Sequence, residues 1–169
     1  MTWVIRARCD DEIDNCVALL ADVHASDRYP LYWPADPRGW LTPPGLIGAW
    51  VAAHDHIVGH IALCGADGDA SAPTWSVACG LPAERLALVS RLFVAPRARR
   101  RALGAALLDV AVAAASSHGR RAALEVLDHD RAALGLYERA GWQRVGSAAA
   151  PWAQERGTRA VVYYYLAPG

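Results

Sequence analysis

The residues of this 169-residue chain that are best placed for chemistry form a basic turn at positions 94–104, with the sequence VAPRARRRALG. An apolar, strand-like run ends at Pro96, and a long helical pattern begins after the arginines. The start of a helix exposes backbone N–H groups and the positive end of the helix dipole. Small residues there let a phosphate approach the main chain, and arginines add charge-assisted hydrogen bonds. The turn therefore predicts an anion site suited to a pyrophosphate.

The basic turn is also compatible with two roles besides a pyrophosphate site. A solvated cationic turn that only aids solubility is common in proteins. A dinucleotide-binding turn needs G-x-G-x-x-G near the first strand and an acid at the end of the second. Here the turn lies late in the chain and holds one glycine. The dinucleotide fold is rejected, and the solvated turn stays open.

Composition excludes several classes of function. All 17 basic residues are arginine, so a Walker A loop and a lysine Schiff base are both absent. The formal net charge is zero, which argues against a broad basic surface, so we expect no nucleic-acid partner; a binder that uses residues 97–101 is the disfavoured alternative. His54, Asp55, His56 and His60 lie close in sequence, but a hairpin turn would spread them, so we expect no metal site.

The basic turn resembles the pyrophosphate-binding motif of the GNAT superfamily of acetyl-CoA-dependent N-acetyltransferases, V-x-P-x-x-(R/Q)-x-x-G-x-(G/A)-x-x-L-L. Val94, Pro96, Arg99 and Gly104 stand in register, as do the two leucines at 107–108, and Ala102 replaces a preferred Gly. A shifted register that starts at Arg101 leaves the Val-x-Pro and Leu-Leu spacings unused.

A second segment, residues 124–142, resembles the family's other motif, L-x-V followed by N-x-x-A-x-x-L-Y and G-F. Asp130 replaces the usual Asn, and Trp142 replaces the usual Phe. The two motifs occur in the family's order and cover about residues 86–145. The first half of the chain matches only in its strand and helix layout.

The resemblance implies acetyl-CoA as co-substrate, no metal, and attack by an amine in a ternary complex. Backbone groups of Leu92, Phe93 and Val94 would bind the pantetheine arm and polarise the thioester carbonyl. Asp130 would contact the cofactor. The pyrophosphate would lie on Arg99, Arg100, Arg101, Ala102, Leu103 and Gly104.

Tyr137 is the expected general acid, because the phenol at that motif position can protonate the departing thiolate. The acceptor ammonium must first lose a proton. Glu125 is one candidate base, since Leu124-Glu125-Val126 resembles the L-E-V stretch of the ribosomal-protein alanine N-acetyltransferases. Glu84, His24 and a chain of waters are other candidates. A non-catalytic acyl-CoA sensor on the same fold is the alternative function.

Residues 26–46 are rich in proline, glycine and aromatic residues and cannot form one regular element. We predict a loop that contacts the acceptor through Tyr29, Trp33 and Asp36, and a packed structural loop is the alternative. The acceptor is expected to be a small-molecule amine or a protein N-terminus.

Strand patterns are found at residues 3–8, 49–54, 56–63, 87–94, 122–127, 142–150 and 160–166, and helical patterns at residues 10–24, 104–118 and 130–140. This alternation of strands and helices predicts one α/β (α+β layered) domain over residues 1–169, with a mixed central sheet flanked by helices. The GNAT resemblance implies that this sheet is splayed and that the chain can form a homodimer. No signal peptide or membrane span is evident, and none of the four cysteines forms a C-x-x-C pair. We therefore expect a cytoplasmic protein with free thiols and no membrane partner.

Overall fold

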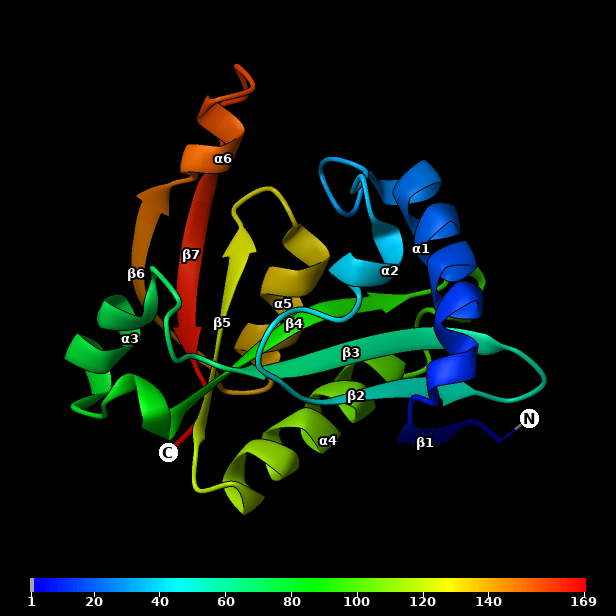
Figure 1. The fold of residues 1–169 in the computed structure, drawn as a ribbon, viewed down its shortest axis with the longest axis horizontal. Coiled ribbons are helices and arrows are strands. Elements are labelled where there is room, and N and C mark those ends of the chain that lie inside the picture. The colour runs from blue at the N-terminus through cyan, green and yellow to red at the C-terminus, as the bar shows by residue number, and fades with distance from the viewer. Residues whose placement is uncertain (1) are drawn as a thin grey trace. The chain divides into compact units, whose positions relative to one another are not determined.

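The computed structural model describes residues 2–169 and arranges seven strands in one mixed sheet of order β1-β2-β3-β4-β5-β7-β6 (Figure 1). This confirms the expected α/β fold with a mixed sheet flanked by helices. The strands are β1 Val4–Ala7, β2 Leu46–Ala53, β3 Ile57–Gly65, β4 Leu86–Val94, β5 Arg121–Leu127, β6 Gln143–Ala149 and β7 Val161–Leu166. The helices are α1 Ile13–Asp27, α2 Pro37–Trp40, α3 Ala72–Cys79, α4 Leu103–Ser117, α5 Arg131–Arg139 and α6 Pro151–Gln154.

The chain divides into two compact units, each made of two separate segments. Unit 1 comprises Met1–Cys64 and Val89–Ala114, and unit 2 comprises Gly65–Leu88 and Ala115–Gly169. Strand β4 is shared, because its first three residues belong to unit 2 and its last six to unit 1.

In unit 1, strands β1, β2 and β3 form an antiparallel sheet, with Val4 opposite Ala53 and Val51 opposite His60. Figure 1 shows α1 crossing in front of β2 and β3. The buried residues of α1 recur at helical spacing, which gives it one apolar face: Ile13, Cys16, Leu19, Leu20 and Val23. Gly59 lets α4 approach β3, since a Cβ there would lie 3.0 Å from the Leu107 Cδ1 atom.

In unit 2, the first residues of β4 pair in parallel with β5, and β7 pairs antiparallel with both β5 and β6. Helix α3 packs against β6 and β7. The Trp75 ring of α3 is buried and meets the Tyr164 ring edge-on, with 5.4 Å between centroids. The same core contains Ala123 of β5, and Leu127 at the end of that strand packs against it.

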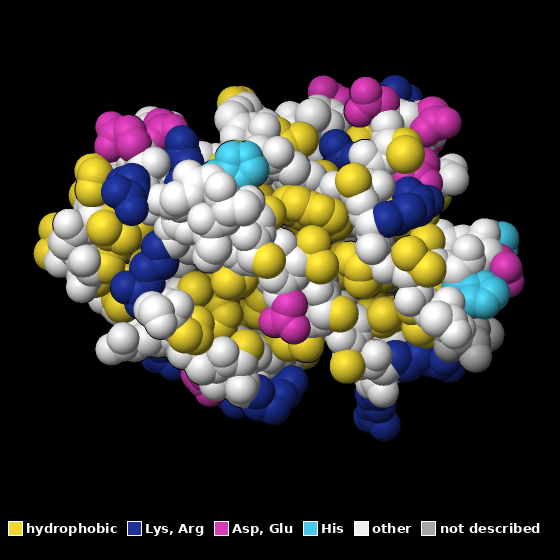
Figure 2. Space-filling view, turned by 90° about the horizontal axis from the view of Figure 1, so that it is seen from below, with side chains coloured by type: hydrophobic (Ala, Val, Ile, Leu, Met, Phe, Trp, Pro, Cys, Tyr) yellow, Lys and Arg dark blue, Asp and Glu magenta, His cyan; other side chains and the backbone are white. Residues whose placement is uncertain are grey.

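Among the described residues, no helix is long and apolar enough to cross a membrane. On the face that Figure 2 shows, arginines form several small separate groups rather than one continuous stripe. The four cysteines are free thiols, of which Cys16 and Cys64 are buried.

Candidate active site

The shared strand β4 contains a backbone irregularity at Arg91, just before Leu92, Phe93 and Val94. Arg91 has a φ of 55°, in the left-handed region, which costs a residue other than glycine about 1–2 kcal/mol. Three contacts hold the conformation. The Arg91 Nε atom donates to the Trp40 carbonyl at 2.9 Å, its guanidinium lies 4.1 Å from the Trp40 ring centroid, and its carbonyl lies 2.9 Å from His60 Nδ1. The twist therefore sets the direction of the three residues expected to bind the pantetheine arm.

His60 is completely buried beneath this irregularity. Its ring stacks on Phe93 at 5.0 Å, and its Nε2 atom lies 2.9 Å from Arg8 Nη1. A guanidinium can only donate, so Nε2 accepts and Nδ1–H donates to the Arg91 carbonyl. Burial lowers the pKa of His60 to about 4, and the side chain is neutral near pH 7. One imidazole thus joins Arg8 of the β1 edge to the irregularity in β4.

The basic turn ends in a backbone shape that suits an anion. Arg100 and Ala102 have φ values of 62° and 57°, and Leu103 then begins α4. A left-handed residue followed by a right-handed one points successive N–H groups into a common concavity, which binds anions. The first α4 hydrogen bond runs from Ala106 N to Ala102 O, so the N–H groups of residues 103–105 precede the helical ladder. The φ of Ala102 also explains the family preference for Gly at this position.

Arg99 has two contacts within unit 1. Its Nε and Nη2 atoms donate to the Val94 carbonyl at 3.2 and 3.1 Å. Its guanidinium also forms an ion pair with Asp27 at the end of α1, and this hydrogen bond holds the pKa of Asp27 below its ordinary value. Arg99 therefore ties the turn to α1, while Arg100 and Arg101 are exposed. Binding of the pyrophosphate by residues 99–104 stays a prediction.

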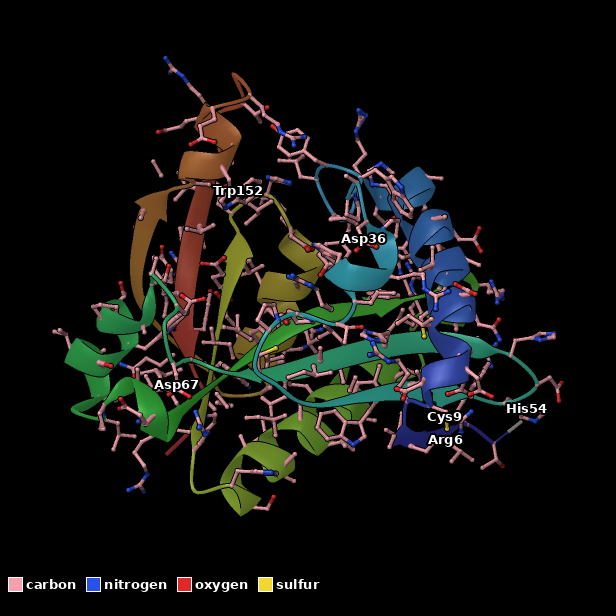
Figure 3. The ribbon with its side chains drawn as sticks, in the orientation of Figure 1. Arg6, Cys9, Asp36, His54, Asp67 and Trp152 are labelled. Atoms are coloured by element: carbon pink, nitrogen blue, oxygen red, sulfur yellow. The ribbon has the colours of Figure 1, made fainter. Side chains whose placement is uncertain are left out.

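Arg97, the first arginine of the turn, lies elsewhere. It lines a pocket of about 390 Å³ together with His54, Asp55 and His56 of the β2–β3 hairpin, and Figure 3 shows His54 at the tip of that hairpin. His60 is buried with Arg8 instead, so the structure does not bring these three hairpin residues together with His60. Among the described residues, no three His, Cys, Asp or Glu side chains form a group that could hold a metal ion.

The segment that follows α1 packs its aromatic rings against one another and against β4. The Tyr29 ring lies 6.1 Å from Trp40 and 6.2 Å from Phe93. His24 lies 5.4 Å from the Trp33 ring and contacts the Pro30 carbonyl through Nδ1 at 2.8 Å. The structural and the binding interpretation of this segment are compatible, because Tyr29 and Trp40 are only partly buried and Trp33 is 40% exposed.

Asp36 has a structural contact in this segment. It caps the short helix α2, accepting a hydrogen bond from Gly39 N at 3.0 Å (Figure 3). Pro37 occupies the first helical position, where its missing N–H costs nothing. The cap occupies one oxygen of the Asp36 carboxylate. Contact between Asp36 and the acceptor stays a prediction.

Unit 2 holds the second group of predicted site residues. Glu125 lies on β5 opposite Tyr164 of β7, and its side chain is exposed. Asp130 is the N-cap of α5, with its carboxylate accepting from Ala133 N at 3.2 Å. Tyr137 is 7% exposed, and its ring lies 5.9 Å from Trp142 and 6.1 Å from Tyr165. The motif thus positions Asp130 and Tyr137 on one helix.

The other candidate bases also lie in different units. Glu84 belongs to the exposed 3-10 turn Ala83–Arg85 in unit 2, and His24 lies in the last turn of α1 in unit 1. Sequence reasoning missed that Arg8, Trp40 and Arg91 take part in the contacts around the backbone irregularity of β4. Their contacts join segments far apart in the chain, and the only signal was the placement of His60 within an otherwise apolar strand.

The comparisons with known proteins bear on the family and the fold of the chain. The model of the acetyltransferase (GNAT) family matches residues 14–142. An N-acetyltransferase from Staphylococcus aureus Mu50 is similar in structure, with a TM-score of 0.76, 13% identity and 99% of each chain covered. NAA60 from Arabidopsis thaliana in complex with acetyl-CoA gives a TM-score of 0.73 at 17% identity, covering 98% of this chain and 97% of that one.

The ribosomal-protein-S18-alanine N-acetyltransferase from Escherichia coli is also similar, with a TM-score of 0.71, 14% identity, and 99% and 96% of the two chains covered. These TM-scores show that the chain shares its fold with these proteins. No curated protein sequence matches the chain significantly. The family model spans more than half of the 169 residues and includes both motifs, so the chain belongs to the acetyltransferase (GNAT) family.

Proposed function

We propose that this chain is an N-acetyltransferase that moves the acetyl group of acetyl-CoA to a primary amine by direct attack in a ternary complex. The observation that carries the proposal is the anion-binding shape of the turn before α4. The left-handed Ala102, the N–H groups of residues 103–105 and the exposed Arg100 and Arg101 together suit a pyrophosphate. The acetyl-CoA bound to the similar NAA60 carries such a group.

In this proposal, the residues after the Arg91 irregularity act on the thioester. Backbone N–H groups of Leu92, Phe93 and Val94 bind the pantetheine arm and polarise the carbonyl where negative charge develops. Their direction is fixed by the contacts of Arg91 with Trp40 and His60. Fixed donors need little reorganisation during the reaction, which is the main source of their catalytic effect.

Tyr137 supplies the proton that the leaving thiolate takes up. Its burial beside Trp142 and Tyr165 fixes the ring, and a positioned general acid contributes about 10²–10⁴-fold to a rate. Glu125 or an ordered water removes the proton from the attacking ammonium. Asp130 supports α5 through its cap, and we propose that it also contacts the cofactor.

Calorimetric titration with acetyl-CoA tests the anion site most simply. We expect Arg100→Glu combined with Gly104→Asp to weaken binding at least ~10-fold, because a charge-assisted hydrogen bond contributes about 1.5–3 kcal/mol. Arg139→Glu combined with Ala140→Asp is the matched control, since it makes the same total change in charge on exposed residues at the end of α5 in unit 2. Equal binding by the double variant and the wild type would contradict the proposed site.

The acyl-CoA sensor is the second candidate function, and it is favoured by one observation. Asp130, which replaces the family's Asn, uses its carboxylate to cap α5. A sensor would bind acetyl-CoA without releasing free thiol in the presence of amines. Thiol release with an amine panel therefore separates the two functions.

A further inference from the structure

The aromatic segment after α1 indicates a chemical class for the acceptor, an inference that rests on the proposed acetyl transfer. Its rings form two groups that are joined through the backbone at residues 29–30. Tyr29 contacts both Trp40 and Phe93, and Phe93 stacks on His60. On the other side of Tyr29, the Pro30 carbonyl contacts His24, whose ring meets Trp33. We call the side chains of Tyr29, Trp33 and Trp40 the aromatic wall.

The aromatic wall is anchored to the sheet of unit 1 by two arginines. Arg91 donates to the Trp40 carbonyl, with its guanidinium above that ring. Arg8 donates to the Leu41 carbonyl at 2.7 Å and contacts His60 and Thr42. These contacts fix the backbone on both sides of the Trp40–Leu41 peptide. Such an anchored surface loses little conformational entropy when a ligand binds.

The charges around the aromatic wall do not favour a second positive charge on the acceptor. Asp36 is the one acid of residues 28–46, and its carboxylate caps α2. Asp27, directly before the segment, pairs with Arg99. The Arg91 guanidinium over the Trp40 ring and the Arg8 guanidinium at the Leu41 carbonyl add positive charge. A diamine would place its distal ammonium in a region where both carboxylates already have cationic or N–H partners.

We propose that the acceptor carries one primary amine next to an aromatic or branched aliphatic group, and that the aromatic wall binds this group. Rings that pack edge-on or tilted add about 0.5–1.5 kcal/mol beyond buried area. The same chemistry occurs in an arylalkylamine and in a peptide whose first residue is aromatic. Polyamines are disfavoured as acceptors.

Steady-state acetylation of four acceptors tests the inference: 2-phenylethylamine, a tetrapeptide that begins with Phe, putrescine and spermidine. We expect kcat/KM for 2-phenylethylamine or the peptide to exceed that for putrescine and spermidine at least ~10-fold, a difference of about 1.4 kcal/mol. The ratio of kcat/KM for 2-phenylethylamine to that for the peptide shows whether the aromatic group belongs to an arylalkylamine or to the first residue of a peptide. A higher kcat/KM for either polyamine would overturn the inference.

Two variants tie any preference to the aromatic wall. Trp33→Ala should raise KM for the preferred acceptor at least ~5-fold, because it removes an aromatic contact of about 1 kcal/mol, and should leave KM for acetyl-CoA unchanged. Val77→Ser is the control, because Val77 is an exposed hydrophobic residue of α3 in unit 2, at 86%. Identical acceptor KM values for Trp33→Ala and the wild type would contradict the inference.

Ligand-observed NMR separates failure of the inference from failure of the proposed function. If no amine releases thiol, binding of 2-phenylethylamine and putrescine is measured in the presence of CoA. Binding of the aromatic amine that Trp33→Ala weakens would support the wall and refute acetyl transfer. No binding of 2-phenylethylamine to the wild type would refute the wall itself.

Discussion

At the scale of single residues, the turn before α4 depends on an alanine in an unfavourable conformation. Ala102 has a φ of 57°, which costs a non-glycine residue about 1–2 kcal/mol. Glycine pays about 0.5–1 kcal/mol more entropy on folding. We therefore expect Ala102→Gly to raise the free energy of unfolding by about 0.5–1 kcal/mol, measured by urea denaturation. A destabilised variant would contradict the left-handed assignment.

The buried His60 predicts a specific dependence of stability on pH. Burial lowers its pKa from 6.5 to about 4, so the unfolded chain binds the proton first as the pH falls. The contribution of the neutral His60 to the free energy of unfolding is fully present above pH 6.5. It is lost as the pH falls from 6.5 to 4, which lowers the free energy of unfolding by about 3 kcal/mol. Glu12 loses its contribution at lower pH, because its hydrogen bond with Arg6 holds its pKa at about 2.

The variant His60→Gln tests whether His60 causes this dependence of stability on pH. Its free energy of unfolding, measured at pH 7 and pH 4.5, should change much less between the two values than that of the wild type, whatever its absolute stability. An unchanged dependence on pH would show that another group carries the effect. This titration could not be predicted from local sequence, because burial of His60 depends on Arg8, Arg91 and Phe93 from other segments of the chain.

At the scale of elements, the strand and helix patterns of the sequence predicted all seven strands and the helices α1, α4 and α5 to within a few residues. The strand at 87–94 and the helix at 104–118 correspond to β4 and α4. The helices α2 and α6 were missed, since four residues give no periodic pattern. Helix α2 depends instead on the Asp36 cap and on contacts of Trp40 with Tyr29 and Arg91.

Gly39→Ala tests what holds α2. A Cβ at Gly39 would lie 2.2 Å from the Asp36 Oδ2 atom, so the carboxylate must move and the cap is lost. We expect a local destabilisation of about 1 kcal/mol. Hydrogen exchange of the Trp40 and Leu41 amides should accelerate, while strand amides of β2 and β3 stay protected. Unchanged exchange at Trp40 would show that the cap contributes nothing to the order of α2.

At the scale of the whole molecule, the two motifs predicted the family because their residues are consecutive in sequence and need no long-range information. The single domain over residues 1–169 remains a prediction, which the interleaving of the two units supports. Each unit contains two chain segments, and β4 contributes to both. Separate unfolding of either unit would disrupt this strand.

We therefore expect one cooperative unfolding transition. Far-UV circular dichroism and the fluorescence of Trp75 in unit 2 and Trp40 in unit 1, each isolated by replacing the other tryptophans with phenylalanine, should give the same midpoint. Two separate midpoints would indicate two independent domains.

Product analysis is the measurement that decides whether the protein transfers acetyl groups with Tyr137 as proton donor. The purified protein is incubated with acetyl-CoA and 2-phenylethylamine, and mass spectrometry quantifies N-acetylated amine and free CoA. We predict equal amounts of both products, with Tyr137→Phe slowing their formation about 10²-fold or more while acetyl-CoA affinity is retained. Binding of acetyl-CoA without acetylation of this or any other amine would contradict the account.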